Sequence, residues 1–174
     1  MSPLILPYDG HSPKISPTAF IASNAVLIGD LEIGDETSVW YNVVIRADVQ
    51  VIRIGKLTNI QDGTVIHVSS REGGNTFIGD GVTIGHMALI HACTLESGCF
   101  VGMSSTVMDD AVVESEAMLG AGALLPPGKR VPRGELWTGR PAKFQRKLTE
   151  QDFEMFKRSA KNYAHEGQIY RKMF

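Results

Sequence analysis

The chain has 174 residues, of which 17 are basic and 19 are acidic, giving a formal net charge of −2. This balance excludes the strongly basic surface that binds nucleic acid or an anionic membrane, and no segment reaches the apolar length of a membrane span. Cys93 and Cys99 lack CxxC spacing and indicate no disulfide framework. Because the first residues also lack a signal-peptide pattern, the composition predicts a soluble, cytoplasmic protein.

Residues 1–20 are rich in proline and predict an extended lead-in. From residue 21 onward a branched aliphatic side chain recurs every six positions. The period slips by three before Ile54, passes a polar break at residues 69–75, and loses one residue after Ile90. The aliphatic residues are Ile21, Leu27, Ile33, Val39, Ile45, Val51, Ile54, Ile60, Ile66, Ile78, Ile84, Ile90, Leu95, Val101, Val107, Val113, Leu119, Leu125 and Val131, and the aromatic Trp137 occupies the last position.

A period of six is neither the 3.6 of a helix nor the two of a half-exposed strand. It is typical of a solenoid of very short strands joined by tight turns, with one aliphatic side chain per strand pointing inward. Residues 21–141 resemble the hexapeptide-repeat family in this respect. The resemblance implies a mainly β fold, the left-handed parallel β-helix, with three hexapeptides in each triangular coil.

Residues 142–174 are expected to form a helical appendage. Thr149 and Asp152 have the spacing of a capping box at a helix start. Apolar side chains then recur at helical spacing on one face, so we expect the helix to pack back along the solenoid. These side chains are Phe153, Phe156, Ala160 and Tyr163.

Three histidines lie within the repeat. His67 and His91 each follow an inward aliphatic residue and are 24 residues apart, which is four hexapeptides instead of the three in one coil. If residues 69–75 loop out, His91 stacks on His67 at the strand spacing of about 4.8 Å. His86 belongs to the preceding hexapeptide and therefore to a different face. We therefore expect a homotrimer whose metal sites each use His67 and His91 of one chain and His86 of the next.

The motifs around these histidines narrow the resemblance to the γ-class carbonic anhydrases. They are IRAD at 45–48, TNIQDG at 58–63, and GHMALIH at 85–91. The resemblance implies that His67, His86 and His91 bind Zn²⁺. Fe²⁺ or Co²⁺ could bind the same three ligands. It also implies that metal-bound hydroxide converts CO₂ to bicarbonate at sites between subunits.

The same resemblance gives roles to six further residues. Arg46 and Asp48 match a pair that makes a salt bridge across the trimer interface, and Asp62 matches an aspartate of that network. The family amide that contacts metal-bound solvent lies in the motif that contains Asn59 and Gln61, and Gln61 could orient the hydroxide. Tyr163 is similar to a tyrosine that short family members direct toward the site.

Without the family, each of these residues has a simpler interpretation. Arg46 and Asp62 would form an ordinary surface ion pair, and Asn59 and Gln61 would be turn residues at a solenoid corner. Tyr163 would pack in the core under the helix.

The residues available to transfer protons between the metal site and the buffer predict slow CO₂ hydration. Better-known members of the family carry a glutamate after the aspartate of the first motif and a long acidic loop after the first histidine. Here Val49 occupies the first position, and Glu72 is the one carboxylate of the loop. The sequence therefore predicts a bound metal with low CO₂ hydration activity.

Three other functions remain open. The chain could be a metal-binding trimer with a structural role, or its metal centre could hydrolyse a small ester or thioester. It could also be an acyltransferase that uses coenzyme A, as many hexapeptide-repeat proteins are. A single histidine would serve as the base in acyl transfer, whereas three converging histidines favour a metal site.

Overall fold

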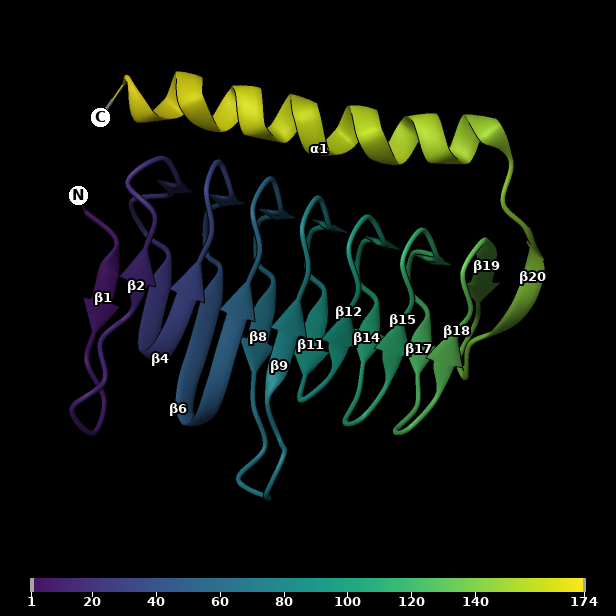
Figure 1. Ribbon diagram of the computed structural model, residues 1–174, viewed down its shortest axis with the longest axis horizontal. Coiled ribbons are helices and arrows are strands. Elements are labelled where there is room, and N and C mark those ends of the chain that lie inside the picture. Colours follow the sequence, from purple (N-terminus) through teal and green to yellow (C-terminus); the bar gives the residue numbers. More distant parts are fainter. Residues whose placement is uncertain (1, 174) are drawn as a thin grey trace.

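The computed structural model describes residues 2–173. The chain forms a left-handed parallel β-helix, as the six-residue period predicts. Figure 1 shows the coils stacked in a row, with the C-terminal helix α1 lying along their whole length. The coils form three sheet faces, which we call face one, face two and face three. Each coil passes through all three faces, so neighbouring coils pair strand on strand.

Faces one and two share a 12-stranded sheet because β4 (Val26–Ile33) and β6 (Val44–Ile54) run across the corner between them. Face one also contains β1 (Leu4–Leu6), β8 (Val65–His67), β11 (Leu89–His91), β14 (Thr106–Val107) and β17 (Leu124–Leu125). Face two also contains β2 (Lys14–Ile15), β9 (Thr76–Ile78), β12 (Thr94–Leu95), β15 (Val112–Val113) and β18 (Arg130–Val131). The lead-in thus joins the solenoid, since β1 and β2 both pair in parallel with β4.

Face three is an eight-stranded sheet. It contains β3 (Phe20–Ile21), β5 (Ser38–Val39), β7 (Asn59–Ile60), β10 (Thr83–Ile84), β13 (Phe100–Val101), β16 (Met118–Leu119), β19 (Glu135–Thr138) and β20 (Lys143–Lys147). β20 lies beyond the repeats and pairs antiparallel with β19.

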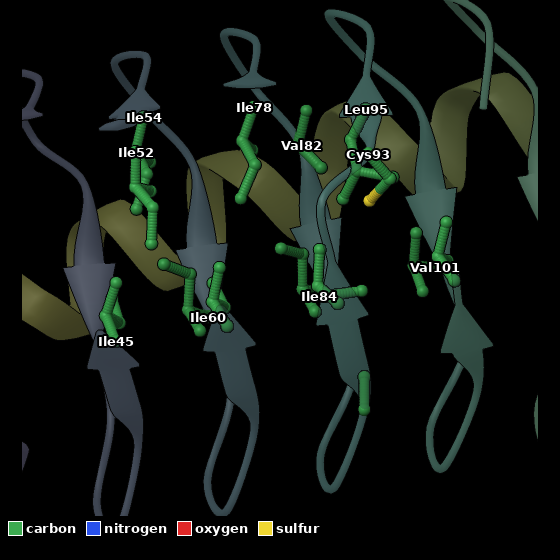
Figure 2. Packing of buried hydrophobic residues seen from close by; sticks show 14 of the residues in the cluster. Ile45, Ile52, Ile54, Ile60, Ile78, Val82, Ile84, Cys93, Leu95 and Val101 are labelled. Carbon is green, nitrogen blue, oxygen red and sulfur yellow. The ribbon is translucent and has the colours of Figure 1, made fainter. Parts of the chain in front are cut away.

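The inward aliphatic residues form one continuous core along the solenoid axis (Figure 2). Positions such as Ile60, Ile66 and Ile90 are completely buried, as the period predicts. Val51 is an exception, and its prediction as an inward residue is wrong. Three extra residues at the corner shift the phase within β6, so that Ile52 points inward and pairs with Leu31 in its place.

Helix α1 (Glu150–Arg171) packs against face three, as predicted. Its buried side includes Phe156, Ala160 and Gly167, and a Cβ at Gly167 would lie 3.2 Å from the Cβ of Phe20. Small residues therefore let the helix lie close to the sheet. In the described part of the chain, no helix has the length and apolar character needed to cross a membrane.

The predicted capping box of α1 is confirmed. Thr149 accepts a hydrogen bond from the backbone N–H of Asp152, and the Asp152 carboxylate accepts one from the backbone N–H of Thr149. We expect Thr149→Ala to lower the free energy of unfolding by about 1 kcal/mol, because a helix N–H loses its partner. Urea titration at fixed protein concentration would measure this change. Thr149→Ser keeps the hydroxyl and should be nearly neutral, and an equal loss in both variants would contradict the role of the cap.

Candidate metal centre

His67 and His91 stack on face one at the ends of β8 and β11. The two residues are register partners, and His67 Nδ1 lies 3.2 Å from His91 Nε2. The predicted stacking is confirmed because residues 69–75 leave the solenoid as a loop, which hangs below β8 and β9 in Figure 1. Two imidazole nitrogens thus face each other at a separation that one metal ion could bridge.

Asp48 contacts His67 from the corner between faces one and two. Its Oδ1 atom lies 3.1 Å from His67 Nε2, and its other oxygen contacts the Arg46 guanidinium. Burial lowers the pKa of His67, and the charges of Arg46 and His91 lower it further, against the opposing effect of Asp48. His67 is therefore held toward the neutral form, which is the form that coordinates a metal.

Asp109 contacts His91 in the same way, and the motifs did not identify it. Its Oδ1 atom lies 2.6 Å from His91 Nδ1, so His91 Nε2 remains directed at His67. Burial raises the pKa of Asp109, but the hydrogen bond with His91 and the charges of His91 and Arg71 outweigh it and lower the pKa. The six-residue period does not predict this contact, because Ile90 pairs with Val107 and Asp109 therefore lies one residue beyond the position that follows His91 in strand register.

His86 lies at the opposite edge of face one, in the turn that joins β10 to β11. Its Nδ1 atom is 2.9 Å from Asp62 Oδ2. Asp62 in turn accepts a 3.3 Å hydrogen bond from the backbone N–H of Tyr41, one coil earlier. The His86 side chain is 40% exposed, and Nδ1 is the ring nitrogen that Asp62 contacts.

Asn59 and Gln61 are buried beneath α1. Asn59 belongs to β7, so its interpretation as a turn residue is wrong. Gln61 Nε2 donates to Asn59 Oδ1 at 3.0 Å, and Asn59 Nδ2 donates to Thr83 Oγ1 at 2.9 Å. The Thr83 hydroxyl donates to Ser159 of α1 at 3.0 Å, so these bonds join the Gln61 amide to the helix. Gln61 and Asp62 are neighbours at the His86 edge of face one.

Tyr163 of α1 packs edge-on against Trp40, with ring centroids 5.5 Å apart. It belongs to an aromatic cluster under the helix, which agrees with a packing role. Burial raises the pKa of the Tyr163 hydroxyl, and the Asp62 carboxylate raises it further, which keeps the phenol neutral. Trp40 is followed by Tyr41, whose backbone N–H donates to Asp62, so Tyr163 lies on the His86 side of the protein.

The predicted residues therefore form two groups on one chain. Arg46, Asp48, His67 and His91 meet at one edge of face one, whereas Asn59, Gln61, Asp62, His86 and Tyr163 lie toward the other. Within residues 2–173, no group of three His, Cys, Asp or Glu side chains is placed to hold one metal ion. Arg46 pairs with Asp48 of its own chain, and its expected contact across an interface stays a prediction.

Cys93 is part of the solenoid core. Burial raises the pKa of its thiol to about 12, which keeps the thiol protonated at neutral pH. A buried thiol of this kind is unreactive. Cys93 is therefore an inert packing residue of the core.

The fold and the three carboxylate-paired histidines define a hexapeptide-repeat protein with a candidate metal-ligand set. A comparison with protein-family profiles finds no match. The chain is 42% identical to a carbonic anhydrase from Geobacillus kaustophilus, over 98% of its own length and 92% of that protein. We conclude that the chain belongs to the γ-class carbonic anhydrase family.

Longer relatives and a solved structure add to this comparison. The chain is 47% identical to the mitochondrial gamma carbonic anhydrase 2 of Arabidopsis thaliana, over 91% of its length, but it spans only 59% of that protein. A crystal structure titled as a hexapeptide transferase family protein from Anaplasma phagocytophilum is 51% identical, with a TM-score of 0.92. The match covers 96% of this chain and 98% of that one.

Proposed function

We propose that the chain forms a homotrimer that hydrates CO₂ to bicarbonate at metal sites shared between subunits. The observation that carries this proposal is the pairing of each of the three histidines with a carboxylate on one ring nitrogen. A carboxylate that accepts the N–H of a histidine fixes its tautomer and leaves the other nitrogen free for a metal. The names of the relatives as carbonic anhydrases support the reaction.

The donor set suits a divalent metal such as Zn²⁺, with Fe²⁺ and Co²⁺ as alternatives. His67 Nδ1 and His91 Nε2 would supply two imidazole donors, and Nε2 of His86 from the next subunit would supply the third. When bound, the metal would act as a Lewis acid that brings the ionisation of water from a pKa of 15.7 to about 7.

The chain's own side chains would prepare the site around this ion. Asp48 would hold the His67 imidazole in position, and Asp62 would do the same for His86. Asn59 fixes the side-chain amide of Gln61. This amide could hydrogen-bond the attacking water, either as donor or as acceptor. With Val49 in place of a glutamate, proton transfer to buffer is expected to limit turnover.

The exposed surface of face one supports association with a second copy of the chain. Apolar side chains remain exposed between the two histidine edges: Val65 is 39% exposed, Leu89 is 41% exposed and Met87 is 67% exposed. Face three is covered by α1, so it is not free for a similar contact. Burial of these side chains in a closed trimer would bring His86 of one chain toward His67 and His91 of another.

The proposal predicts about one divalent metal per chain, measured by elemental analysis of the purified protein, and CO₂ hydration measured by stopped flow. His86→Ala should abolish both, because each site loses one of its three ligands. His165→Ala is the matched control, since His165 is an exposed histidine of α1 far along the chain from the ligands. Metal-free wild-type protein, or equal hydration by wild type and His86→Ala, would contradict the proposal.

Acyl transfer is the second candidate, because the similar crystal structure carries a transferase title. The three carboxylate-paired histidines favour a metal site over acyl transfer, in which a single histidine would act as the base. Incubation with acetyl-coenzyme A and amine acceptors would detect thiol release if this candidate is correct. The same samples, tested with a small ester and a thioester, distinguish a hydrolase from a metal-binding trimer without turnover.

A further inference from the structure

The contact between His91 and Asp109 differs from the other two carboxylate–histidine contacts. Asp48 and Asp62 come from the motifs that carry the family resemblance, whereas Asp109 lies outside all of them. Yet its 2.6 Å contact with His91 is the shortest of the three, since the others measure 3.1 and 2.9 Å. A short contact to a charged acceptor is the strong kind of hydrogen bond.

The backbone of Asp109 is fixed by stacked corners of the solenoid. Its carbonyl oxygen accepts a 2.8 Å hydrogen bond from the backbone N–H of Gly128 in the following coil. The backbone N–H of Asp110 donates to the carbonyl oxygen of Ala92 in the preceding coil, also at 2.8 Å. Ala92, Asp110 and Gly128 all have positive φ, so the three corners turn alike. Asp109 is therefore held on a rigid element beside His91.

Arg71 contacts this corner from the loop of residues 69–75. Its Nη2 atom lies 2.6 Å from Asp110 Oδ1, and its Nε atom lies 3.8 Å from Asp109 Oδ2. The loop is itself closed, because Ser69 N–H donates to the Gly74 carbonyl at 2.8 Å. Thus the Asp109 oxygen that does not contact His91 faces a cation supplied by the loop.

We propose that Asp109 is a positioning residue for the metal ligand His91 and that Arg71 orients Asp109 for this role. The pair fixes the His91 ring so that Nε2 points at His67, and it connects the loop of residues 69–75 to the strength of metal binding. This inference rests on the proposed function, because it assumes that His91 is a ligand. It extends that function by assigning roles to two residues outside the motifs.

The test measures the affinity of the full-length protein for Zn²⁺ and Co²⁺ by competition with a chelator. Asp109→Ala is expected to weaken binding about 10–100-fold, the usual loss when a carboxylate partner of a histidine ligand is removed. It should also alter the visible absorption of the Co²⁺ form. Asp109→Glu keeps the charge and should recover part of the affinity. Glu116→Gln is the matched control, because Glu116 contacts Arg133 at another solenoid corner and should leave the affinity unchanged.

Arg71 is tested by a double-mutant cycle. Arg71→Ala should weaken metal binding less than Asp109→Ala, and the double variant should bind no more weakly than Asp109→Ala alone, because Arg71 acts through Asp109. Additive losses would overturn the role given to Arg71. Unchanged affinity and an unchanged Co²⁺ spectrum in Asp109→Ala would overturn the role of Asp109. If wild-type protein binds no metal, the proposed function itself fails, which is a separate outcome.

Discussion

Mixing His67→Ala chains with His86→Ala chains is expected to restore roughly one quarter of the wild-type metal sites, if chains assort at random. Each variant alone should have no complete site, because His67 and His86 are both ligands. In a mixed trimer, a His86→Ala chain keeps the stacked pair, and a His67→Ala neighbour supplies His86. Unfolding and refolding the mixture, followed by metal analysis and CO₂ hydration, measures the recovery.

The control for this experiment uses two substitutions in the same half of the site. His67→Ala and His91→Ala both disrupt the stacked pair, whose ring nitrogens lie 3.2 Å apart in one chain. No assortment of these chains rebuilds that pair, so their mixture should stay without metal. Recovery in this control, or its absence in the first mixture, would show that the ligands are not divided between chains in the proposed way.

Gly29→Ala is expected to lower the free energy of unfolding by about 3 kcal/mol or more. Gly29 lies in β4 with φ at +80°, and a Cβ there would lie 2.0 Å from the backbone oxygen of Ala47 in the neighbouring coil. The substitution therefore combines an unfavourable backbone conformation with a clash between strands that cannot move apart without losing their hydrogen bonds. Urea titration at matched protein concentration measures the loss.

Gly122→Ala separates the two causes. Gly122 has φ at +68°, but a Cβ there would meet no atom within 4 Å. Its substitution should cost only the backbone term, about 1–2 kcal/mol. If both variants lose the same stability, the close approach of the coils at Gly29 contributes nothing, and that part of the argument is wrong.

The sequence predicts the core well because each inward position depends only on the period. Ile66 and Ile90 are inward residues, and this places the next residue of each strand, a histidine, on the outer surface in register. The failure at Val51 has a physical reason. Extra residues at a corner can be absorbed at several points, and the period alone does not say which aliphatic residue resumes the inward row.

Contacts between outward side chains are harder to predict, because they depend on the length of each coil. His67 is in register with Arg46, 21 residues earlier, and with His91, 24 residues later. Both intervals exceed the 18 residues of three hexapeptides, so the irregular coils lie where the ligands are. Asp109 lies 18 residues after His91 although the strands there are in register at 17, so its contact depends on the corner conformation of its own coil. The pairing of Arg46 with Asp48 likewise depends on side-chain conformations that no spacing determines.

The antiparallel strand β20 also limits how the solenoid can grow. β19 pairs in parallel with β16 on one side and antiparallel with β20 on the other. All five residues of β20, Lys143–Lys147, are exposed, and three of them are Lys or Arg. A further coil from another molecule would meet a reversed strand with charged side chains, two of them in ion pairs, and charged edge strands resist strand addition. β20 at the end of face three therefore opposes the end-to-end stacking of molecules into fibres.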